Sequence, residues 1–436
     1  MATKISFVSL GCDKNLIDSE IMLGLIDEKG YIITPNDSEA DVIIINSCGF
    51  ILDANQEAID KVLEMADYKA NGNCKALIVT GCMAQRYKDE IFESLPEVDA
   101  VVGTGDFENI GAVIDRLLNG EKKVQLVTDI NHLLNENNSY KRMVTTTGGF
   151  SYLKIAEGCD NRCTYCTIPS LRGKYRSRNI ESLVKEAEIL ADKGVRELIL
   201  IAQDTSLYGK DLYGEQKLHV LLQEISKIED IKWIRILYCY PENVYDELID
   251  EMASNPKVLH YLDMPVQHTN DRILKLMGRR STGDKIKDTV NRLRAKMPDM
   301  CIRTTLITGF PTETQEEFES VIMKYFNIDS ETLQSKTVYY SEDSTYEYKP
   351  RGFEEVEYPE YPYSEVVGFS ENSDGTITLT ANVVFPYAGD SKVYAHEVVV
   401  RPLEDGGVQY VSNRIIPSKD NYRETWHTPR LTLEEW

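Results

Sequence analysis

Three cysteines stand close together in the middle of the chain, within the segment EGCDNRCTYCTIPSLRG. They are Cys159, Cys163 and Cys166, with the spacing CxxxCxxC. No fourth ligand for a tetrahedral zinc ion is obvious beside them, whereas three thiolates can hold three irons of a [4Fe–4S] cube and leave the fourth iron open. An open iron can bind the amino and carboxylate groups of S-adenosylmethionine. The spacing therefore predicts a cluster that cleaves this molecule to a radical; a zinc knuckle or unrelated cysteines are the alternatives.

The elements around this motif alternate between strands and helices. Five short apolar runs predict parallel strands at Tyr152–Ala156, Glu197–Gln203, Trp233–Tyr238, Leu259–Met264 and Ile302–Thr308. Helical patterns separate them, as at Ile180–Lys193 and Thr282–Lys296, and Thr314 begins a capping box with Glu317. This order predicts a partial barrel of parallel strands. The cysteine motif directly follows the first strand, at the end of a barrel that carries active sites.

A second set of three cysteines is widely spaced in the first part of the chain. Strand-like runs alternate there with helical patterns, which predicts a parallel sheet covered by helices. The runs are Lys4–Leu10, Asp41–Asn46 and Lys75–Thr80, and the cysteines just beyond them are Cys12, Cys48 and Cys82. Because the carboxyl ends of parallel strands meet at one edge, we expect these cysteines to converge. The adjacent glycines Gly11, Gly49 and Gly81 would let the backbone approach a bulky cluster. Ordinary buried cysteines are the alternative.

The composition limits the classes to which this chain can belong. It has 436 residues, 42% of them hydrophobic, a formal charge of −23 and nine cysteines. We see no run of eighteen apolar residues and no signal-peptide pattern, so we expect a cytoplasmic protein without a membrane span. An odd number of cysteines without an export signal favours metal binding or catalysis over disulfides. The acidity argues against direct nucleic-acid binding, which needs clustered Lys and Arg.

The last part of the chain has a different character. No cysteine follows Cys301, and Glu354–Ser364 is too rich in proline and charge for a regular element. Thr376–Phe385 and Lys392–Arg401 alternate apolar and polar residues as antiparallel strands do. We therefore expect an α/β protein with an N-terminal parallel-sheet α/β domain, a partial (βα) TIM-type barrel and a small β-rich C-terminal module. These parts span residues 1–140, 145–325 and 326–436.

Several motifs together resemble a known enzyme family. CxxxCxxC after the first barrel strand, with ITGFP at Ile307–Pro311, resembles the radical-SAM superfamily. SLGCDKNLIDSE, INSCGF and TGCMAQR, which surround the three separated cysteines, resemble the N-terminal domain of the methylthiotransferases. GCDKN at the first cysteine and the segment Tyr261–Arg279 resemble the branch that modifies a ribosomal protein, whereas the tRNA branch typically has GCQMN. The resemblance covers about residues 4–322.

This resemblance implies a radical-SAM methylthiotransferase with two [4Fe–4S] clusters and S-adenosylmethionine as cofactors. It implies that the second cluster is held by Cys12, Cys48 and Cys82. It also implies that S-adenosylmethionine is bound by Gln203, Asp204, Gly309 and Pro311. The implied substrate is the small-subunit ribosomal protein S-twelve, methylthiolated at the β-carbon of an aspartate, with electrons from a donor such as flavodoxin or ferredoxin.

The resemblance fades near Ile322. Members of the family complete the barrel with a sixth strand and end in a small β-barrel called TRAM. Thr337–Thr345 faintly resembles that strand, and no TRAM likeness is visible in Tyr410–Trp436. A lineage-specific module or a join between two genes would each explain this change. The alternatives to a ribosomal-protein enzyme are a tRNA adenosine methylthiotransferase, an inactive chimera and a non-catalytic iron–sulfur protein.

Overall fold

The computed structural model describes residues 2–132, 136–146, 149–325, 327–336, 339–340, 345–346, 363–385, 390–403 and 408–416. It is mixed α/β, as predicted, and divides into two compact units, Met1–Leu306 and Ile307–Trp436. No helix in the described parts of the chain is both long enough and apolar enough to cross a membrane.

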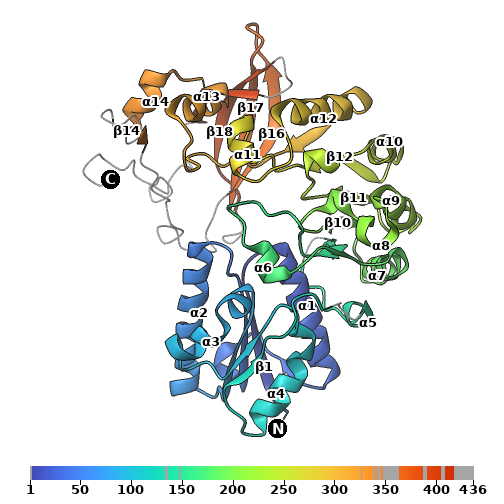
Figure 1. The fold of residues 1–436 in the computed structure, drawn as a ribbon, viewed down its shortest axis with the longest axis vertical. Helices are drawn as coiled ribbons and strands as arrows, with labels where there is room; N and C mark the ends of the chain where they lie inside the picture. Colours follow the sequence, from blue (N-terminus) through green and yellow to red (C-terminus); the bar gives the residue numbers. More distant parts are fainter. Residues whose placement is uncertain are drawn as a thin grey trace. The chain divides into compact units, whose positions relative to one another are not determined.

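The first unit begins with a six-stranded parallel sheet in the order β2-β1-β3-β4-β5-β6. Its strands are β1 (Lys4–Ser9), β2 (Ile32–Ile33), β3 (Val42–Ser47), β4 (Ala76–Gly81), β5 (Ala100–Val102) and β6 (Val124–Leu126). Every residue of β3 and β4 is buried, because helices cover both faces. The helices on one face are α2 (Leu52–Asn71) and α3 (Cys82–Ser94), and those on the other are α1 (Asp13–Glu28) and α4 (Ile110–Leu118) (Figure 1).

A second parallel sheet of the same unit has five strands in the order β13-β12-β11-β10-β7. They are β7 (Phe150–Lys154), β10 (Glu197–Ile201), β11 (Trp233–Ile236), β12 (Val258–Asp263) and β13 (Cys301–Arg303), which confirms the predicted partial barrel with small shifts of the strand ends. Helices cover its outer side (Figure 1). They are α7 (Ile180–Asp192), α9 (Leu218–Ser226), α10 (Asp246–Ser254) and α12 (Gly283–Lys296).

Helix α1 packs against both sheets. Ile17 and Ile21 of this helix share one apolar core with Ile44 of β3 and with Ile199 and Ile201 of β10. The alternate β10 residues lie in a separate core with α7 and α9, as the alternation of side chains along a strand requires. One helix of the N-terminal part therefore covers the inner face of the partial barrel, so the two sheets form a single unit.

The described residues of the second unit include two helices and a four-stranded antiparallel sheet in the order β16-β17-β18-β19, which confirms the predicted β-rich module. The helices are α13 (Gln315–Tyr325) and α14 (Ser330–Lys336), and the strands are β16 (Tyr363–Glu371), β17 (Ile377–Phe385), β18 (Asp390–Pro402) and β19 (Val408–Ile416). The predicted capping box is present at the start of α13. The Thr314 amide donates to Glu317 Oε2 at 2.8 Å, and the Glu317 amide donates to Thr314 Oγ1 at 3.3 Å.

The expected sixth barrel strand at Thr337–Thr345 is wrong. Within the described part of this segment, β14 (Tyr339–Tyr340) pairs antiparallel with β15 (Thr345–Tyr346), and the parallel sheet of the first unit ends at β13. Aromatic residues favour an extended backbone but do not select its partner strand. Most of the proline-rich segment Glu354–Ser364 lies outside the described residues.

Candidate functional site

The three separated cysteines lie just beyond the carboxyl ends of three neighbouring strands. Cys12 follows β1 and is the N-cap of α1, Cys48 follows β3, and Cys82 follows β4 as the first residue of α3. Burial raises the pKa of Cys82 to about 11, and the nearby Cys12 and Cys48 thiolates act in the same direction. The loops that carry the three thiols contact one another, since an added Cβ at Gly11 would lie 2.9 Å from Cys48 Cβ and one at Gly49 would lie 2.8 Å from the carbonyl carbon of Cys82. Two of them also lie at helix N-termini, whose dipoles favour a thiolate.

The glycines beside these cysteines let the loops at the strand ends approach one another closely, and their predicted role beside a cluster stays a prediction. A Cβ added at Gly11, where φ is +91°, would lie 2.9 Å from the Cβ of Cys48. A Cβ at Gly49 would lie 2.7 Å from the Met83 amide nitrogen. The missing side chains therefore let the three strand-end loops pack against one another, and the close approach is between loops of the protein.

The CxxxCxxC motif lies in a loop after β8 (Ala156–Glu157). The Cys159 amide donates to the Gly173 carbonyl at 3.0 Å, and the Cys166 amide donates to the Cys163 carbonyl at 3.0 Å. Burial raises the pKa of Cys159 to about 11, and the charges of Cys163 and Cys166 act in the same direction. The loop is closely packed at Gly158, since a Cβ there would lie 2.0 Å from the Lys174 carbonyl oxygen.

All six of these cysteines are free thiols. In the described ranges, no three Cys, His, Asp or Glu side chains are arranged to hold a single metal ion. The cysteines of a four-iron cube bind separate irons, so they need not converge on one atom. Two sets of three thiols, each gathered at strand ends, therefore fit clusters of this type better than they fit a zinc ion.

A buried arginine joins the two sets of cysteines. Arg172 ends α6 (Ile168–Arg172), six residues after Cys166, and its side chain is 2% exposed. Its Nη1 donates to Asp18 Oδ2 at 2.6 Å, and its Nη2 donates to Asn15 Oδ1. The same Asn15 Oδ1 accepts from Cys82 Sγ at 3.7 Å, and the nearby guanidinium lowers the pKa of Cys82 against the larger effect of burial. A residue of the barrel part thus contacts the cysteine site of the N-terminal sheet.

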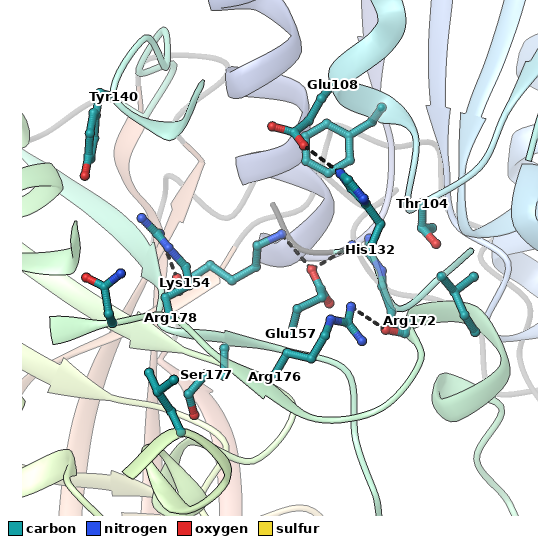
Figure 2. A pocket seen from close by; sticks show the side chains of 16 residues that line it. Thr104, Glu108, His132, Tyr140, Lys154, Glu157, Arg172, Arg176, Ser177 and Arg178 are labelled. Atoms are coloured by element: carbon teal, nitrogen blue, oxygen red, sulfur yellow. Dashed lines mark hydrogen bonds and ion pairs between the residues drawn. The ribbon is translucent and has the colours of Figure 1, made fainter. Parts of the chain in front are cut away.

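Lys154 and Glu157 extend this ionic network. Lys154 Nζ lies 2.5 Å from Asp18 Oδ1 and 2.7 Å from Glu157 Oε2. Figure 2 shows the Glu157 carboxylate beside the Lys154 amine. Burial would raise the pKa of Glu157, but Lys154 and Arg172 outweigh it and hold that pKa well below its usual range. Glu157 therefore carries a full negative charge two residues before Cys159.

The two predicted cofactor residues of the first unit follow β10. Gln203 Nε2 donates to Glu157 Oε1 at 3.1 Å, while Gln203 Oε1 is buried and makes no hydrogen bond with any described residue. An unused buried acceptor fits the ammonium group of an amino acid. Asp204 differs, since its carboxylate already accepts from Ser206 Oγ and Asn243 Nδ2, both at 2.7 Å. Asp204 thus orders the loop after β10.

The other two predicted cofactor residues belong to the second unit. Gly309 has φ +73° and precedes the turn that leads to α13, in which the Phe310 amide donates to Glu313 Oε2 at 2.9 Å. Pro311 is exposed in the same turn. Their roles in binding S-adenosylmethionine stay predictions.

The buried carboxyl group of Asp204 makes stability depend on pH. Burial raises its pKa from 3.8 to about 6, so the neutral form is favoured in the folded state. The neutral carboxyl group of Asp204 therefore contributes fully to the stability of the folded state below pH 4. This contribution is lost as the pH rises through 6, because the buried group then ionises. We expect Asp204→Asn to stabilise the chain by an amount that grows between pH 4.5 and 7.5, reaching on the order of 2 kcal/mol. Urea unfolding of the two proteins under anaerobic reducing conditions measures this difference.

A matched control is Asp230→Asn, because Asp230 is exposed and lies 3.7 Å from its partner Arg196. Exposed pairs of this kind contribute little, so this change should shift stability by less than about 1 kcal/mol at either pH. A difference between Asp204→Asn and the unaltered chain that stays constant across this pH range would contradict the assignment.

Several residues of this site were missed in the sequence. Besides Arg172, Asp18 and Lys154, they include Tyr238, whose hydroxyl lies 3.2 Å from Asp13 Oδ1 and whose ring lies 2.9 Å from Lys14 Nζ. The sequence signal that could have indicated these residues is the set of acidic residues in α1. In an ordinary amphipathic helix such residues face solvent, so acidic residues on a helix that is buried on several sides indicate buried basic partners. Their partners lie more than a hundred residues further along the chain, so no local pattern reveals them.

Family comparisons match three successive parts of the chain. Residues 4–103 match the uncharacterized protein family UPF0004, and residues 153–324 match the radical SAM superfamily. Residues 311–430 match a family of unknown function, DUF6070. The last match covers most of the second unit. The point near Ile322 where the resemblance to the methylthiotransferases fades therefore lies close to the start of a match to a different family.

Curated relatives cover most of the chain. A ribosomal protein uS12 methylthiotransferase RimO from Clostridium botulinum is 54% identical over 320 residues, which are 73% of this chain and 71% of that protein. The RimO of Acetivibrio thermocellus is 53% identical over 328 residues, with the same coverage. Among solved structures, the radical S-adenosylmethionine methyltransferase TsrM from Kitasatospora setae aligns with TM-score 0.54 at 13% identity, over 74% of this chain and 73% of TsrM, which shows likeness of fold alone. With both cysteine sites and the matching superfamily segment, these relatives show that the chain belongs to the RimO family of radical-SAM methylthiotransferases.

Proposed function

We propose that this chain attaches a methylthio group to the β-carbon of an aspartate in ribosomal protein uS12. The observation that carries the proposal is the shared contact at Asn15 Oδ1, which accepts from Arg172, just after the CxxxCxxC loop, and from Cys82 of the N-terminal site. Through this contact, the segment that follows one set of three free thiols packs against the site formed by the other set. Relatives that are 53% and 54% identical to this chain, over 71% of their own length, bear the name ribosomal protein uS12 methylthiotransferase.

The proposed cofactors are S-adenosylmethionine and two [4Fe–4S] clusters. Cys159, Cys163 and Cys166 would hold one cluster, and Cys12, Cys48 and Cys82 the other. When bound, the first supplies the electron that cleaves S-adenosylmethionine to a radical, and the second carries the sulfur to be transferred. Gln203, Asp204, Gly309 and Pro311 would contact S-adenosylmethionine. The electron donor would be a flavodoxin or ferredoxin, and the site of action the cytoplasm, where thiols stay reduced.

The protein's own side chains orient the two sites and exclude water. Helix α1 covers the inner face of the barrel with apolar residues, and its Asp18 accepts from Arg172 and Lys154 in a buried network. On the other side of the CxxxCxxC loop, the Thr164 amide donates to the Met277 carbonyl at 3.0 Å. These contacts hold the loop rigid, and a dry site strengthens every charge interaction within it. We assign the two sites to residues 1–140 and 145–325, and residues 326–436 to a separate module.

The number of clusters is tested by anaerobic reconstitution. We expect about eight irons and eight sulfides per chain, since each cube contains four of each. Replacing Cys12, Cys48 and Cys82 together by alanine should leave about four, and so should replacing Cys159, Cys163 and Cys166. Iron and sulfide analysis of the unaltered chain and both variants measures this. About four irons in the unaltered chain would contradict the two-cluster proposal.

A second candidate function follows from the DUF6070 match at residues 311–430. A chain whose last part comes from another family can retain cleavage of S-adenosylmethionine while lacking the means to dock uS12, and would then be an inactive chimera. The two candidates differ in one assay. Methylthiolated uS12 supports the transferase, whereas 5′-deoxyadenosine without modified uS12 supports the chimera.

A further inference from the structure

A cavity of about 540 Å³ lies within the first unit, where the N-terminal sheet, the segment between β6 and β7, and the barrel part meet (Figure 2). Its volume is in the range of pockets that hold small organic molecules. Its lining includes Glu108 and Phe107 from the sheet, and Arg172 and Arg176 from the segment after the CxxxCxxC loop. The residues predicted to bind S-adenosylmethionine are not among those that line it. The cavity is therefore a site that the proposed function has not used.

The charges around this cavity favour an anion. Four basic side chains line it, against the two carboxylates of Glu108 and Glu157. The basic residues are Lys154, Arg172, Arg176 and Arg178. Three of them form close ion pairs with carboxylates of the protein, two with Asp18 and one with Glu186. Their charges are therefore compensated within the protein, and the fourth, Arg176, is the basic group of the lining that is left for an anion.

Arg176 is the basic residue of the cavity that makes no direct ion pair with a described carboxylate. Its guanidinium donates to the carbonyl oxygens of Lys174 at 2.5 Å and Arg172 at 3.1 Å. The side chain is partly buried. A guanidinium can form charge-assisted hydrogen bonds with an anionic group, which would be stronger than these contacts with neutral carbonyl oxygens.

The cavity lies close to the N-terminal cysteine site. Arg172 lines the cavity and donates to Asp18 and to Asn15 Oδ1, which also accepts from Cys82 Sγ at 3.7 Å. An anion held beside Arg176 would therefore lie next to the residue that contacts the cysteine site. The apolar side chains of Phe107 and Leu212 line the same cavity and offer a surface for a carbon skeleton.

We propose that this cavity receives the anionic sulfur compound that supplies sulfur to the Cys12, Cys48 and Cys82 site. This inference rests on the proposed function, in which that site carries the sulfur to be transferred. The shared chemistry is a sulfur anion, and its two sources are free hydrosulfide and a small organic persulfide. Hydrosulfide is already at the sulfide level. A persulfide RSS⁻ would take up one proton and two electrons from the flavodoxin or ferredoxin donor, its S–S bond would break, and it would yield hydrosulfide and the thiolate RS⁻, which leaves the cavity. The volume greatly exceeds that of one water-sized ion, about 30 Å³, which favours the persulfide.

The kinetic test compares Arg176→Gln with Arg176→Lys at saturating S-adenosylmethionine, with either hydrosulfide or cysteine persulfide as the sulfur source. We expect Arg176→Gln to raise the KM for sulfur by about tenfold, because a charge-assisted contact is lost, and Arg176→Lys to raise it less. The matched control is Arg116→Gln, whose exposed side chain pairs with Glu121 on α4, and it should keep the original KM. An effect on persulfide alone assigns the cavity to the organic carrier, and an effect on both assigns it to hydrosulfide.

A binding test separates this inference from the proposed function. Inorganic thiosulfate is added to the reconstituted chain at constant ionic strength, and the thermal unfolding midpoint is recorded. We expect thiosulfate to raise the midpoint of the unaltered chain and of Arg116→Gln, but not of Arg176→Gln. Unchanged KM values for both sulfur sources, or no thiosulfate effect on the unaltered chain, would overturn the inference. Absence of methylthiolation in all proteins, with the thiosulfate effect intact, would refute the proposed function alone.

Discussion

Cys163→Ala should reduce the yield of 5′-deoxyadenosine to background, whereas Cys48→Ala should preserve part of that yield and eliminate methylthiolation. Cys163 lies between Cys159 and Cys166 in a loop whose thiols influence one another, and no spare cysteine is adjacent. Cys48 belongs to the other site, where Gly11 packs against it. The two substitutions therefore separate cleavage of S-adenosylmethionine from transfer of sulfur. Chromatography of the nucleoside product and mass spectrometry of uS12 measure the two yields.

The control for these substitutions is Cys301→Ala. Cys301 is exposed at the start of β13 and belongs to neither set of three cysteines. We expect both yields to stay at their original values in this variant. An unchanged 5′-deoxyadenosine yield in Cys163→Ala would refute the assignment of the CxxxCxxC loop. Retained methylthiolation in Cys48→Ala would refute a role for the N-terminal cysteines in sulfur transfer.

The strands and helices of the first unit were largely predictable because their signals are local. Val42–Ser47 and Ala76–Gly81 are apolar along most of their length, which is typical of strands buried on both faces, and both are fully buried. Since the cysteines follow such strands directly, their convergence at one sheet edge followed from topology. The capping box at Thr314 and Glu317 is local as well, and it begins a helix where expected.

The contacts between the two sheets were not predictable, because they depend on residues far apart in the sequence. Arg142 lies in a polar segment that reads as a linker, yet it is 1% exposed and pairs with Glu20 of α1 and Glu186 of α7. Glu20 belongs to a helix whose polar residues would ordinarily face solvent. Each of these buried charges is stabilised by a partner that is distant in sequence, so its burial cannot be recognised from the neighbouring residues alone. For the same reason, the β-propensity near Tyr339 did not reveal that these residues pair with a local hairpin strand.

The second large effect is expected at Arg172. Arg172→Met should lower the free energy of unfolding by about 3 to 5 kcal/mol, because it removes one partner of a buried ion pair and leaves the other uncompensated. The group left behind is Asp18, which is 4% exposed and would retain only Lys154. Urea unfolding of the apo chain measures this change. Arg292→Met is the matched control, since Arg292 is more exposed, pairs with a largely exposed Asp246, and should cost less than about 1 kcal/mol.

The effect at Arg172 should also be strongly coupled to Asp18. Once Asp18→Asn has removed the carboxylate, the further loss of the guanidinium should cost less than it does in the unaltered chain. A double-mutant cycle is therefore expected to give a coupling energy of about 1 to 3 kcal/mol, as for residues in one buried network. Additive effects would show that Arg172 acts through packing alone. Arg172 also donates to Asn15, whose Oδ1 accepts from Cys82 Sγ. Arg172→Met should therefore further reduce the iron bound at the N-terminal site, whereas Asp18→Asn, which leaves the contact with Asn15 in place, should reduce it less. Equal iron loss in both variants would mean that the ionic network, and not the contact with Asn15, supports that site.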